Sequence, residues 1–260
     1  MNESERLSNC VVAITGGCGD IGQATALRLI REGAKVVLLD RASDGSLGAD
    51  LRGNPSVTYI PCDVTDRASV ERAVAKIVGQ HQKLDVLIAN AGMVANEAFL
   101  DVNISNLKAT MEVNFFGAFH AAQVAARQMM KQPLSDRGVR GKILFTGSWV
   151  QDMPWPEGTS YIASKGALKM LAKVMAQELA AQGIRVNILT PGIVMAGLSK
   201  KIYEADPTFR GRVAEAIPLN DMQTAESVAD GYAFLCSSDS DYMTGASLLI
   251  DGGCSLVKRK

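Results

Sequence analysis

The sequence has no excess of charge of either sign. Lys plus Arg and Asp plus Glu each number 27 among 260 residues, so the formal net charge is zero. The sequence therefore lacks the basic excess that would indicate binding to nucleic acid or to an anionic membrane surface. No apolar run approaches the length of a membrane span, which is about 18 residues. Residues 1–9 are polar and lack the apolar centre of a signal peptide, which favours a cytoplasmic protein.

Histidine and paired cysteine are also scarce. The sequence has only His81 and His120, so we expect no histidine-based metal site. The five cysteines are scattered without a C-x-x-C pair, at positions 10, 18, 62, 236 and 254. In a chain of this length they indicate reduced thiols and not a disulfide framework.

Short apolar runs alternate with longer segments of helical periodicity along the whole chain. We expect strands at 11–14, 35–39, 57–60, 84–89, 142–145, 184–189 and 247–250, and helices at 21–31, 66–78, 107–130, 161–181 and 225–235. This alternation predicts an α/β fold, a Rossmann-type doubly wound parallel sheet of about seven strands with helices on both faces. No repeat or break in composition interrupts it, so we predict one domain over residues 1–260.

A glycine-rich turn lies between the first expected strand and the first expected helix. It reads Thr-Gly-Gly-Cys-Gly-Asp-Ile-Gly over residues 15–22. Glycines permit a tight turn and a close approach of backbone to a pyrophosphate, and a helix N-terminus supplies free N–H groups. Glycines also serve in ordinary turns, but this position between strand and helix predicts dinucleotide binding.

Asp40 ends the second expected strand, some twenty residues beyond the glycine-rich turn. A carboxylate at this place accepts hydrogen bonds from the adenosine ribose and repels a 2′-phosphate, although Asp40 could instead be a turn or cap residue. Arg41 could pair with a 2′-phosphate, yet the glycine turn itself contains no Lys or Arg. The sequence therefore favours NAD over NADP.

Tyr161 and Lys165 are four residues apart, with Ser148 thirteen residues upstream of the tyrosine. Four residues is just over one helical turn, so both side chains lie on the same helix face. A phenol has a pKa of about 10 and is a weak base, but a nearby ammonium lowers that pKa. The pair is suited to take a proton from an alcohol or return one to a carbonyl. A surface tyrosine beside a solvated lysine is the alternative.

These features together resemble the short-chain dehydrogenase/reductase family over residues 11–253. Segments that match its motifs are 15–22, 63–64, 90–92, 191–192, 244–245 and 251–253. The resemblance assigns to cofactor binding Gly16, Cys18, Gly19, Asp20, Ile21, Asp40, Arg41, Asp63, Val64, Asn90, Ala91, Gly92, Tyr161, Lys165, Pro191, Gly192, Ile193 and Val194.

The resemblance also implies a catalytic tetrad of Asn114, Ser148, Tyr161 and Lys165. In that mechanism Tyr161 is the base in oxidation and the acid in reduction, and Ser148 hydrogen-bonds the substrate oxygen. Lys165 lowers the pKa of Tyr161 and holds the nicotinamide ribose, while Asn114 positions a water in a proton relay. Singly, Asn114 could be a polar packing residue and Ser148 a residue of a turn.

Two positions depart from the family pattern. Asp20 stands where the middle glycine of the turn is usual, and we expect it to point away from the phosphates and cap the first helix. Ala196 stands where a threonine often hydrogen-bonds the nicotinamide carboxamide. Backbone groups near Ile193 and Val194 could hold that amide instead.

Two segments should wall the substrate pocket: residues 149–158, and residues 195–217 as a substrate lid. The Pro-Trp-Pro stretch of the first is similar to glucose and other aldose 1-dehydrogenases of the family. That similarity implies oxidation of the anomeric hydroxyl of a sugar to a lactone. Gln151 could bond a sugar hydroxyl, and Trp149 or Trp155 could lie against the ring. Alternatively, Trp155 simply packs between its prolines.

The expected lid carries Lys200, Lys201 and Arg210 among acidic residues. These cations could clamp an anionic sugar, or they could belong to a solvated pair of helices with mixed charge. A 3-oxoacyl carbonyl reductase is an alternative enzyme, and a non-catalytic nucleotide-sensing scaffold is the alternative from another class. Small apolar residues on helices 107–130 and 159–182 match the four-helix subunit contact of the family, which implies a homotetramer, or they pack on the sheet.

Overall fold

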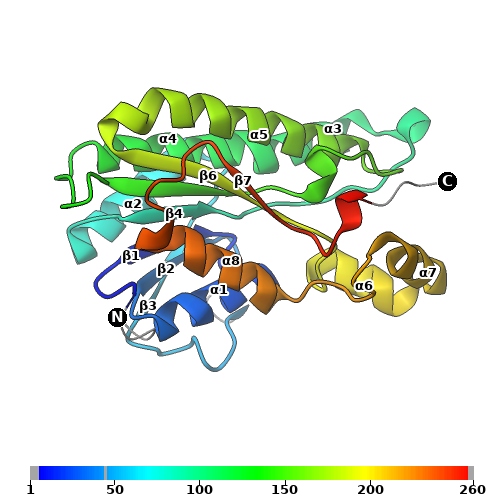
Figure 1. The fold of residues 1–260 in the computed structure, drawn as a ribbon, viewed down its shortest axis with the longest axis horizontal. Coiled ribbons are helices and arrows are strands. Elements are labelled where there is room, and N and C mark those ends of the chain that lie inside the picture. The colour runs from blue at the N-terminus through cyan, green and yellow to red at the C-terminus, as the bar shows by residue number, and fades with distance from the viewer. Residues whose placement is uncertain (1–5, 44–45, 257–260) are drawn as a thin grey trace.

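The computed structural model describes residues 6–43 and 46–256, so the polar start of the chain, residues 1–5, lies outside it. Its centre is a seven-stranded parallel sheet with the order β3-β2-β1-β4-β5-β6-β7 (Figure 1). The strands are β1 Val11–Thr15, β2 Lys35–Asp40, β3 Val57–Pro61, β4 Val86–Ala89, β5 Gly141–Thr146, β6 Ile184–Pro191 and β7 Ser247–Ile250. The predicted doubly wound α/β fold is confirmed.

Helices cover both faces of the sheet. They are α1 Asp20–Arg31, α2 Arg67–His81, α3 Ile104–Met111, α4 Ala118–Met129, α5 Thr159–Leu179, α6 Gly197–Ala205, α7 Pro207–Ala216 and α8 Ala225–Cys236. Helices α1 and α8 pack on one face, and α2, α4 and α5 on the other (Figure 1). Because both faces are covered, every residue of β1, β4 and β5 is buried, as continuous apolar runs in the sequence predict.

The long helix expected over 107–130 is not one α-helix. A π-helical segment, Glu112–Gly117, separates α3 from α4, and this corrects the expectation. The segment passes close to Val64 at Gly117, where a Cβ would lie 2.6 Å from Cγ2 of Val64. Asn114 lies within this π-helical segment and is buried, and π-helical segments are frequent at functional sites.

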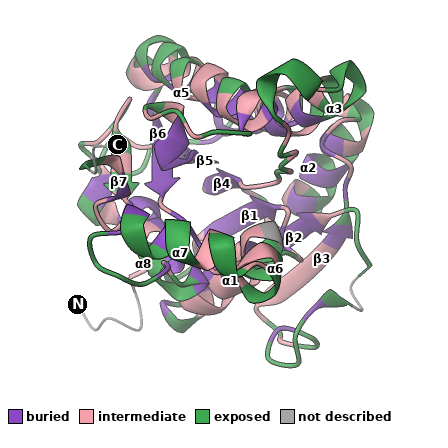
Figure 2. Ribbon diagram, turned by 90° about the vertical axis from the view of Figure 1, so that its right-hand side faces the viewer, coloured by how far each residue is buried: buried purple, intermediate pink, exposed green. Residues whose placement is uncertain are grey.

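All seven strands are parallel, so their carboxyl ends lie at one edge of the sheet. Ligands of open α/β sheets bind beyond this edge, at the point where the strand order reverses, here between β1 and β4. Helices α6 and α7 project beside the same edge, with their outer surfaces exposed (Figure 2). No helix in the described ranges is long and apolar enough to cross a membrane.

Candidate active site

The glycine-rich turn after β1 packs too closely against its neighbours to admit side chains at Gly16 and Gly22. Gly16 has a φ of +65°, and a Cβ on it would lie 2.8 Å from Cα of Ala91. A Cβ on Gly22 would lie 2.5 Å from the carbonyl oxygen of Gly16. The first helical hydrogen bond runs from the N–H of Gln23 to the carbonyl of Gly19. The N–H groups of residues 20–22 therefore remain at the helix N-terminus as donors for an anion.

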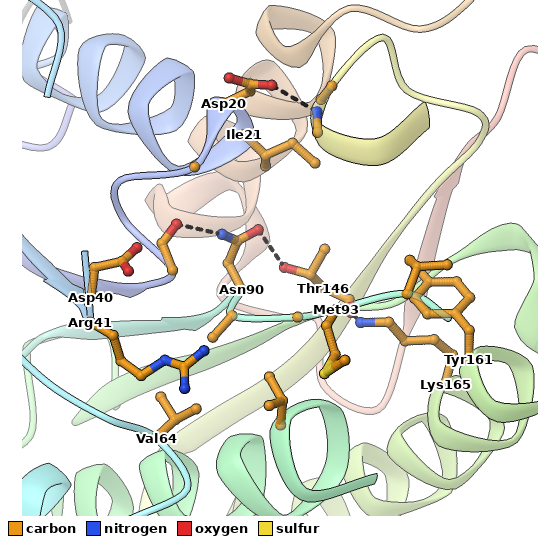
Figure 3. A pocket seen from close by; sticks show the side chains of 18 of the residues that line it. Asp20, Ile21, Asp40, Arg41, Val64, Asn90, Met93, Thr146, Tyr161 and Lys165 are labelled. Carbon is orange, nitrogen blue, oxygen red and sulfur yellow. Dashed lines mark hydrogen bonds between the residues drawn. The ribbon is translucent and has the colours of Figure 1, made fainter. Parts of the chain in front are cut away.

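Asp20 does not cap α1. The N-cap residue is Gly19, which has no side-chain cap, so the expected capping role of Asp20 is wrong. The Asp20 carboxylate instead accepts a hydrogen bond of 2.7 Å from the N–H of Gly197, at the start of α6 (Figure 3). The reason is tertiary: the first turn of α6 lies opposite the glycine turn and has no capping side chain of its own.

Asp40 is fixed at the carboxyl end of β2 by two backbone donors. Its carboxylate accepts hydrogen bonds from the N–H of Cys18 at 2.9 Å and of Ala42 at 3.0 Å. The neighbouring Arg41 lies 3.8 Å from a carboxylate oxygen of Asp63. Burial pushes the pKa of Asp63 upward, but hydrogen bonds from Thr65 and the charge of Arg41 outweigh it and lower that pKa.

One cleft collects most of the residues that the sequence assigns to a cofactor (Figure 3). They are Gly16, Gly19, Asp20, Ile21, Asp40, Arg41, Asp63, Val64, Asn90, Ala91, Gly92, Tyr161 and Lys165. Gly192 and Ile193 line the adjoining pocket instead, whereas Pro191 and Val194 line neither. Cys18 is also absent from the lining, and its backbone N–H supports Asp40 from behind.

Tyr161 and Lys165 lie together on α5, one turn apart, as their spacing predicts. The Nζ of Lys165 is 5.4 Å from the ring centre of Tyr161 and donates a hydrogen bond of 2.7 Å to the carbonyl of Thr146. Burial lowers the pKa of Lys165 to about 8. Burial also raises the pKa of Tyr161, more than its hydrogen bond with Ser148 lowers it. The protein groups alone therefore do not produce the lowered phenol pKa that the sequence led us to expect.

Asn114 is held inside the π-helical segment by the backbone of Met93. Its Oδ1 accepts from the Met93 N–H at 2.8 Å, and its Nδ2 donates to the Met93 carbonyl at 2.9 Å and to Oγ of Ser164 at 3.0 Å. Gly92 lies between Asn114 and Lys165. A Cβ on Gly92 would be 3.4 Å from Oδ1 of Asn114 and 3.8 Å from Nζ of Lys165. The missing side chain leaves open the space between the two functional groups.

Thr146, at the end of β5, is a functional position that we did not predict from the sequence. Its carbonyl accepts from Lys165, and its hydroxyl bonds the hydroxyl of Tyr232. The same hydroxyl donates to Oδ1 of Asn90 (Figure 3). Tyr232 is fully buried on α8, across the sheet from Lys165. A polar chain thus crosses the sheet to the ammonium group. A buried tyrosine hydroxyl needs a partner, and this need was the available signal in the sequence.

A second pocket lies on the other side of Tyr161 and has a mainly apolar wall. Its apolar residues are Val94, Trp149, Val150, Trp155, Ile162, Ile193, Ile202 and Phe209, and its polar side chains are Asn96, Ser148, Tyr161 and Ser199. The rings of Trp149 and Trp155 meet edge to face, with centres 5.3 Å apart. Because Ser148 and Tyr161 lie where this pocket meets the cleft, an alcohol carbon in the pocket could face a nicotinamide.

The structure brings only two of the predicted substrate residues, Trp149 and Trp155, to this pocket. Gln151 donates its amide hydrogens to the hydroxyls of Thr190 and Ser247.

The three predicted cations do not line the pocket either. Lys200 borders an open groove outside α6, and Lys201 is exposed. Arg210 donates to the carbonyls of Tyr203 and Glu204 at the end of α6. A basic side chain beside the last carbonyls of a helix is a common stabilising arrangement, so the role of Arg210 here is local.

The site has the features of a dinucleotide-dependent oxidoreductase. The glycine cradle and the uncapped N-terminus of α1 fit a pyrophosphate, the Asp40 carboxylate fits a ribose, and the Tyr–Lys pair adjoins an apolar pocket. Comparisons with known proteins agree. A family model described as enoyl-(acyl carrier protein) reductase matches residues 18–255.

Individual relatives cover almost the whole chain. The chain is 33% identical to (+)-borneol dehydrogenase 1 of Salvia officinalis, over 98% of this chain and 96% of that protein. It is 32% identical to the glucose 1-dehydrogenase of Gluconobacter oxydans (strain 621H), over 97% and 94%. A crystal structure of a short-chain type dehydrogenase/reductase from Mycobacterium marinum matches with a TM-score of 0.88 and 31% identity, over 98% and 99%. The chain belongs to the short-chain dehydrogenase/reductase family, whose members are NAD(P)-linked oxidoreductases acting on CH–OH groups.

Proposed function

We propose that this protein is an NAD-dependent dehydrogenase that oxidises a secondary alcohol with mainly apolar substituents to the ketone. The observation that carries the proposal is the wall of Trp149, Trp155, Ile193, Ile202 and Phe209 facing Ser148 and Tyr161. Apolar walls with a few convergent polar groups are typical of sites for small apolar molecules. The resemblance to a (+)-borneol dehydrogenase supports the same class of substrate.

In the proposed mechanism, the chain's own residues orient the alcohol and move its proton. The hydroxyl of Ser148 donates a hydrogen bond to the substrate oxygen, and the phenolate oxygen of Tyr161 accepts the substrate proton. The ammonium of Lys165, 5.4 Å from the ring centre of Tyr161, partly offsets the burial that disfavours the phenolate. The opening beside Gly92 connects Lys165 with Asn114 for proton release. A bound nicotinamide supplies the hydride acceptor. The apolar wall limits water beside the reacting carbon.

The carboxylate of Asp40 is our reason for proposing NAD and not NADP. It is already held by two N–H groups, so its remaining lone pairs face the cleft in a fixed direction. We expect Asp40→Ser to bind NAD more weakly and to use NADP, because the variant loses a charged hydrogen bond to NAD and the repulsion of a 2′-phosphate. The ratio of the two kcat/KM values should change by at least about tenfold. Steady-state kinetics with both cofactors measures it, and Arg41→Ala is the control, which should weaken NADP alone. A wild-type preference for NADP contradicts the assignment.

Oxidation of the anomeric hydroxyl of a sugar to a lactone is the second candidate. Asn96 and Ser199 add polar groups to the pocket, and the rings of Trp149 and Trp155 offer apolar surface for a sugar ring. The similarity to a glucose 1-dehydrogenase supports this candidate. Its anionic form has less support, since Lys200, Lys201 and Arg210 do not line the pocket.

A single panel assay distinguishes the candidates. Alicyclic secondary alcohols, neutral aldoses and the matching sugar acids are each given with NAD, and the absorbance of reduced nicotinamide is followed. Because burying each additional CH₂ is worth about 0.8 kcal/mol, we expect the alicyclic alcohols to show kcat/KM values higher by about tenfold or more. A preference for aldoses selects the sugar candidate. If none of the compounds yields reduced nicotinamide, both candidates are contradicted.

We further propose a homotetramer in the cytoplasm, with residues 1–260 as one domain and residues 195–217 as a substrate lid. The support for assembly is the outer face of α5, where Met170 and Val174 are exposed together with Phe116 of the π-helical segment. Exposed apolar groups of this kind mark interaction surfaces. The proposed location rests on the reduced thiols expected from the sequence.

A further inference from the structure

One hydrogen bond joins the phosphate-binding turn to the helices that wall the substrate pocket. The acceptor is Oδ2 of Asp20, the first residue of α1, and the donor is the N–H of Gly197, 177 positions further along the chain (Figure 3). Gly197 begins α6, and the residue before it, Ala196, offers no capping side chain. The carboxylate of Asp20 therefore satisfies one of the free donors at the start of α6.

The segment that Asp20 holds, α6–α7 (residues 197–216), has open space on both of its sides. Its inner side supplies Ser199, Ile202 and Phe209 to the substrate pocket. Its outer side borders a groove between α6, α1 and α8, lined by Gln23, Leu27, Lys200 and Glu226 among others. Asp20 itself lines both the cofactor cleft and this groove. The bond to Gly197 thus spans the gap between the glycine turn and the substrate wall.

We propose that Asp20 is a positioning residue that latches the α6–α7 segment against the glycine turn and so sets the affinity for substrate. A carboxylate is suited to this task because a charge-assisted hydrogen bond is stronger than a neutral one and the N-terminus of α6 attracts negative charge. The proposed function enters only in the assignment of Ile202 and Phe209 to substrate binding. The latch itself is a contact between two parts of the chain.

The negative charge of Asp20 distinguishes the latch from a purely mechanical contact. Asp20 lines the same cleft as the glycine turn, so a pyrophosphate bound there would be disfavoured by this charge, while the hydrogen bond favours a closed wall. Two substitutions separate these effects. Asp20→Asn keeps an oxygen acceptor for Gly197 and removes the charge, whereas Asp20→Ala removes both.

Limited trypsin digestion without cofactor tests the latch directly, because Lys200 and Lys201 lie in the first turns of α6. We expect Asp20→Ala to speed the first cleavage at these lysines by about tenfold, the change expected for the loss of a charged hydrogen bond. Asp20→Asn should stay within about threefold of the wild type, since a neutral hydrogen bond remains. Glu226→Ala is the matched control. It removes a carboxylate from the same groove, and no hydrogen bond in the described structure joins Glu226 to α6.

Kinetics then separates positioning from simple stability. In Asp20→Ala the KM for the best alcohol should rise about tenfold with kcat changed less than about threefold, and Asp20→Asn should restore KM. An unchanged rate of cleavage or an unchanged KM in Asp20→Ala, or equal rates of cleavage in the Ala and Asn variants, overturns the latch. Digestion needs no cofactor or alcohol. A failure of the proposed function would therefore leave the digestion result intact, and it would appear as absent turnover in the wild type.

Discussion

Tyr161→Phe is expected to give a folded protein that still binds NAD and has lost nearly all turnover. The substitution removes one oxygen from a half-buried ring whose packing partners stay in place. That oxygen is the proposed acceptor of the substrate proton, and a positioned acid or base contributes about 10²- to 10⁴-fold in rate. We expect kcat to fall by this factor, measured as appearance of reduced nicotinamide, while NAD binding measured by calorimetry changes little.

The matched control for this experiment is Tyr242→Phe. Tyr242 is fully exposed and does not line either pocket, so the same chemical change should leave kcat unaltered. Ser148→Ala should also reduce kcat, because Ser148 hydrogen-bonds the Tyr161 hydroxyl. Turnover of Tyr161→Phe near the wild-type rate removes Tyr161 from its proposed role.

Lys165→Met is expected to abolish turnover and yet leave a protein at least as stable as the wild type at pH 7. Lys165 is buried, and its described contacts are a carbonyl hydrogen bond and the face of Tyr161, without a carboxylate. Lowering of its pKa from 10.5 to about 8 shows that burial disfavours the ammonium. The difference corresponds to about 3 kcal/mol at neutral pH, partly offset in the variant by loss of a hydrogen bond worth about 1 kcal/mol.

The pH dependence of this comparison has a definite sign. Between about pH 8 and 10.5 the folded wild type has released the Lys165 proton and the unfolded chain still holds it. The unfolded state binds more protons in this window, so the stability of the wild type rises with pH relative to that of Lys165→Met. From pH 7 to pH 10 the relative gain should be about 2–3 kcal/mol, measured by urea unfolding at both pH values. A constant difference would show that Lys165 keeps an ordinary pKa.

Lys142→Met provides the contrasting control. Lys142 is also buried, but its Nζ lies 2.8 Å from a carboxylate oxygen of Asp241 and 2.9 Å from Oγ of Ser240. Removing this ammonium leaves the partly buried carboxylate of Asp241 with Arg137 as its remaining cation, and we expect a cost of about 1–3 kcal/mol. The same substitution at two buried lysines should therefore act in opposite directions on stability at pH 7.

The fold and the cofactor cleft were largely predictable because both depend on local sequence. Strands buried on both faces leave apolar runs such as 11–14 and 184–189, and the strand ends then place Asp40 and Asn90 at one edge of the sheet. Gly16 and Gly22 were identifiable because close backbone contacts allow no other residue there. Because the carboxyl ends of parallel strands lie at the same edge of the sheet, the order of the strands alone decides which of these residues become neighbours.

Contacts between distant segments were not predictable in the same way. Asp20 was expected to cap its own helix, and its actual partner is Gly197. Arg210 and Gln151 were expected to reach a substrate, yet nearby carbonyls and hydroxyls of the protein satisfy them. The spacing of apolar residues around Asn114 does not distinguish the π-helical segment from an α-helix. These features depend on which polar groups meet after packing.

The hydrogen-bonded chain from Tyr232 through Thr146 to Lys165 has a consequence for engineering this protein. Helix α8 carries none of the residues that line the cleft or the apolar pocket, so it would be an obvious region for repacking toward heat resistance. Its Tyr232 hydroxyl nevertheless steadies the threonine whose carbonyl holds the ammonium. Libraries that vary this helix should therefore be screened for rate as well as for melting temperature, since gains in one can be losses in the other.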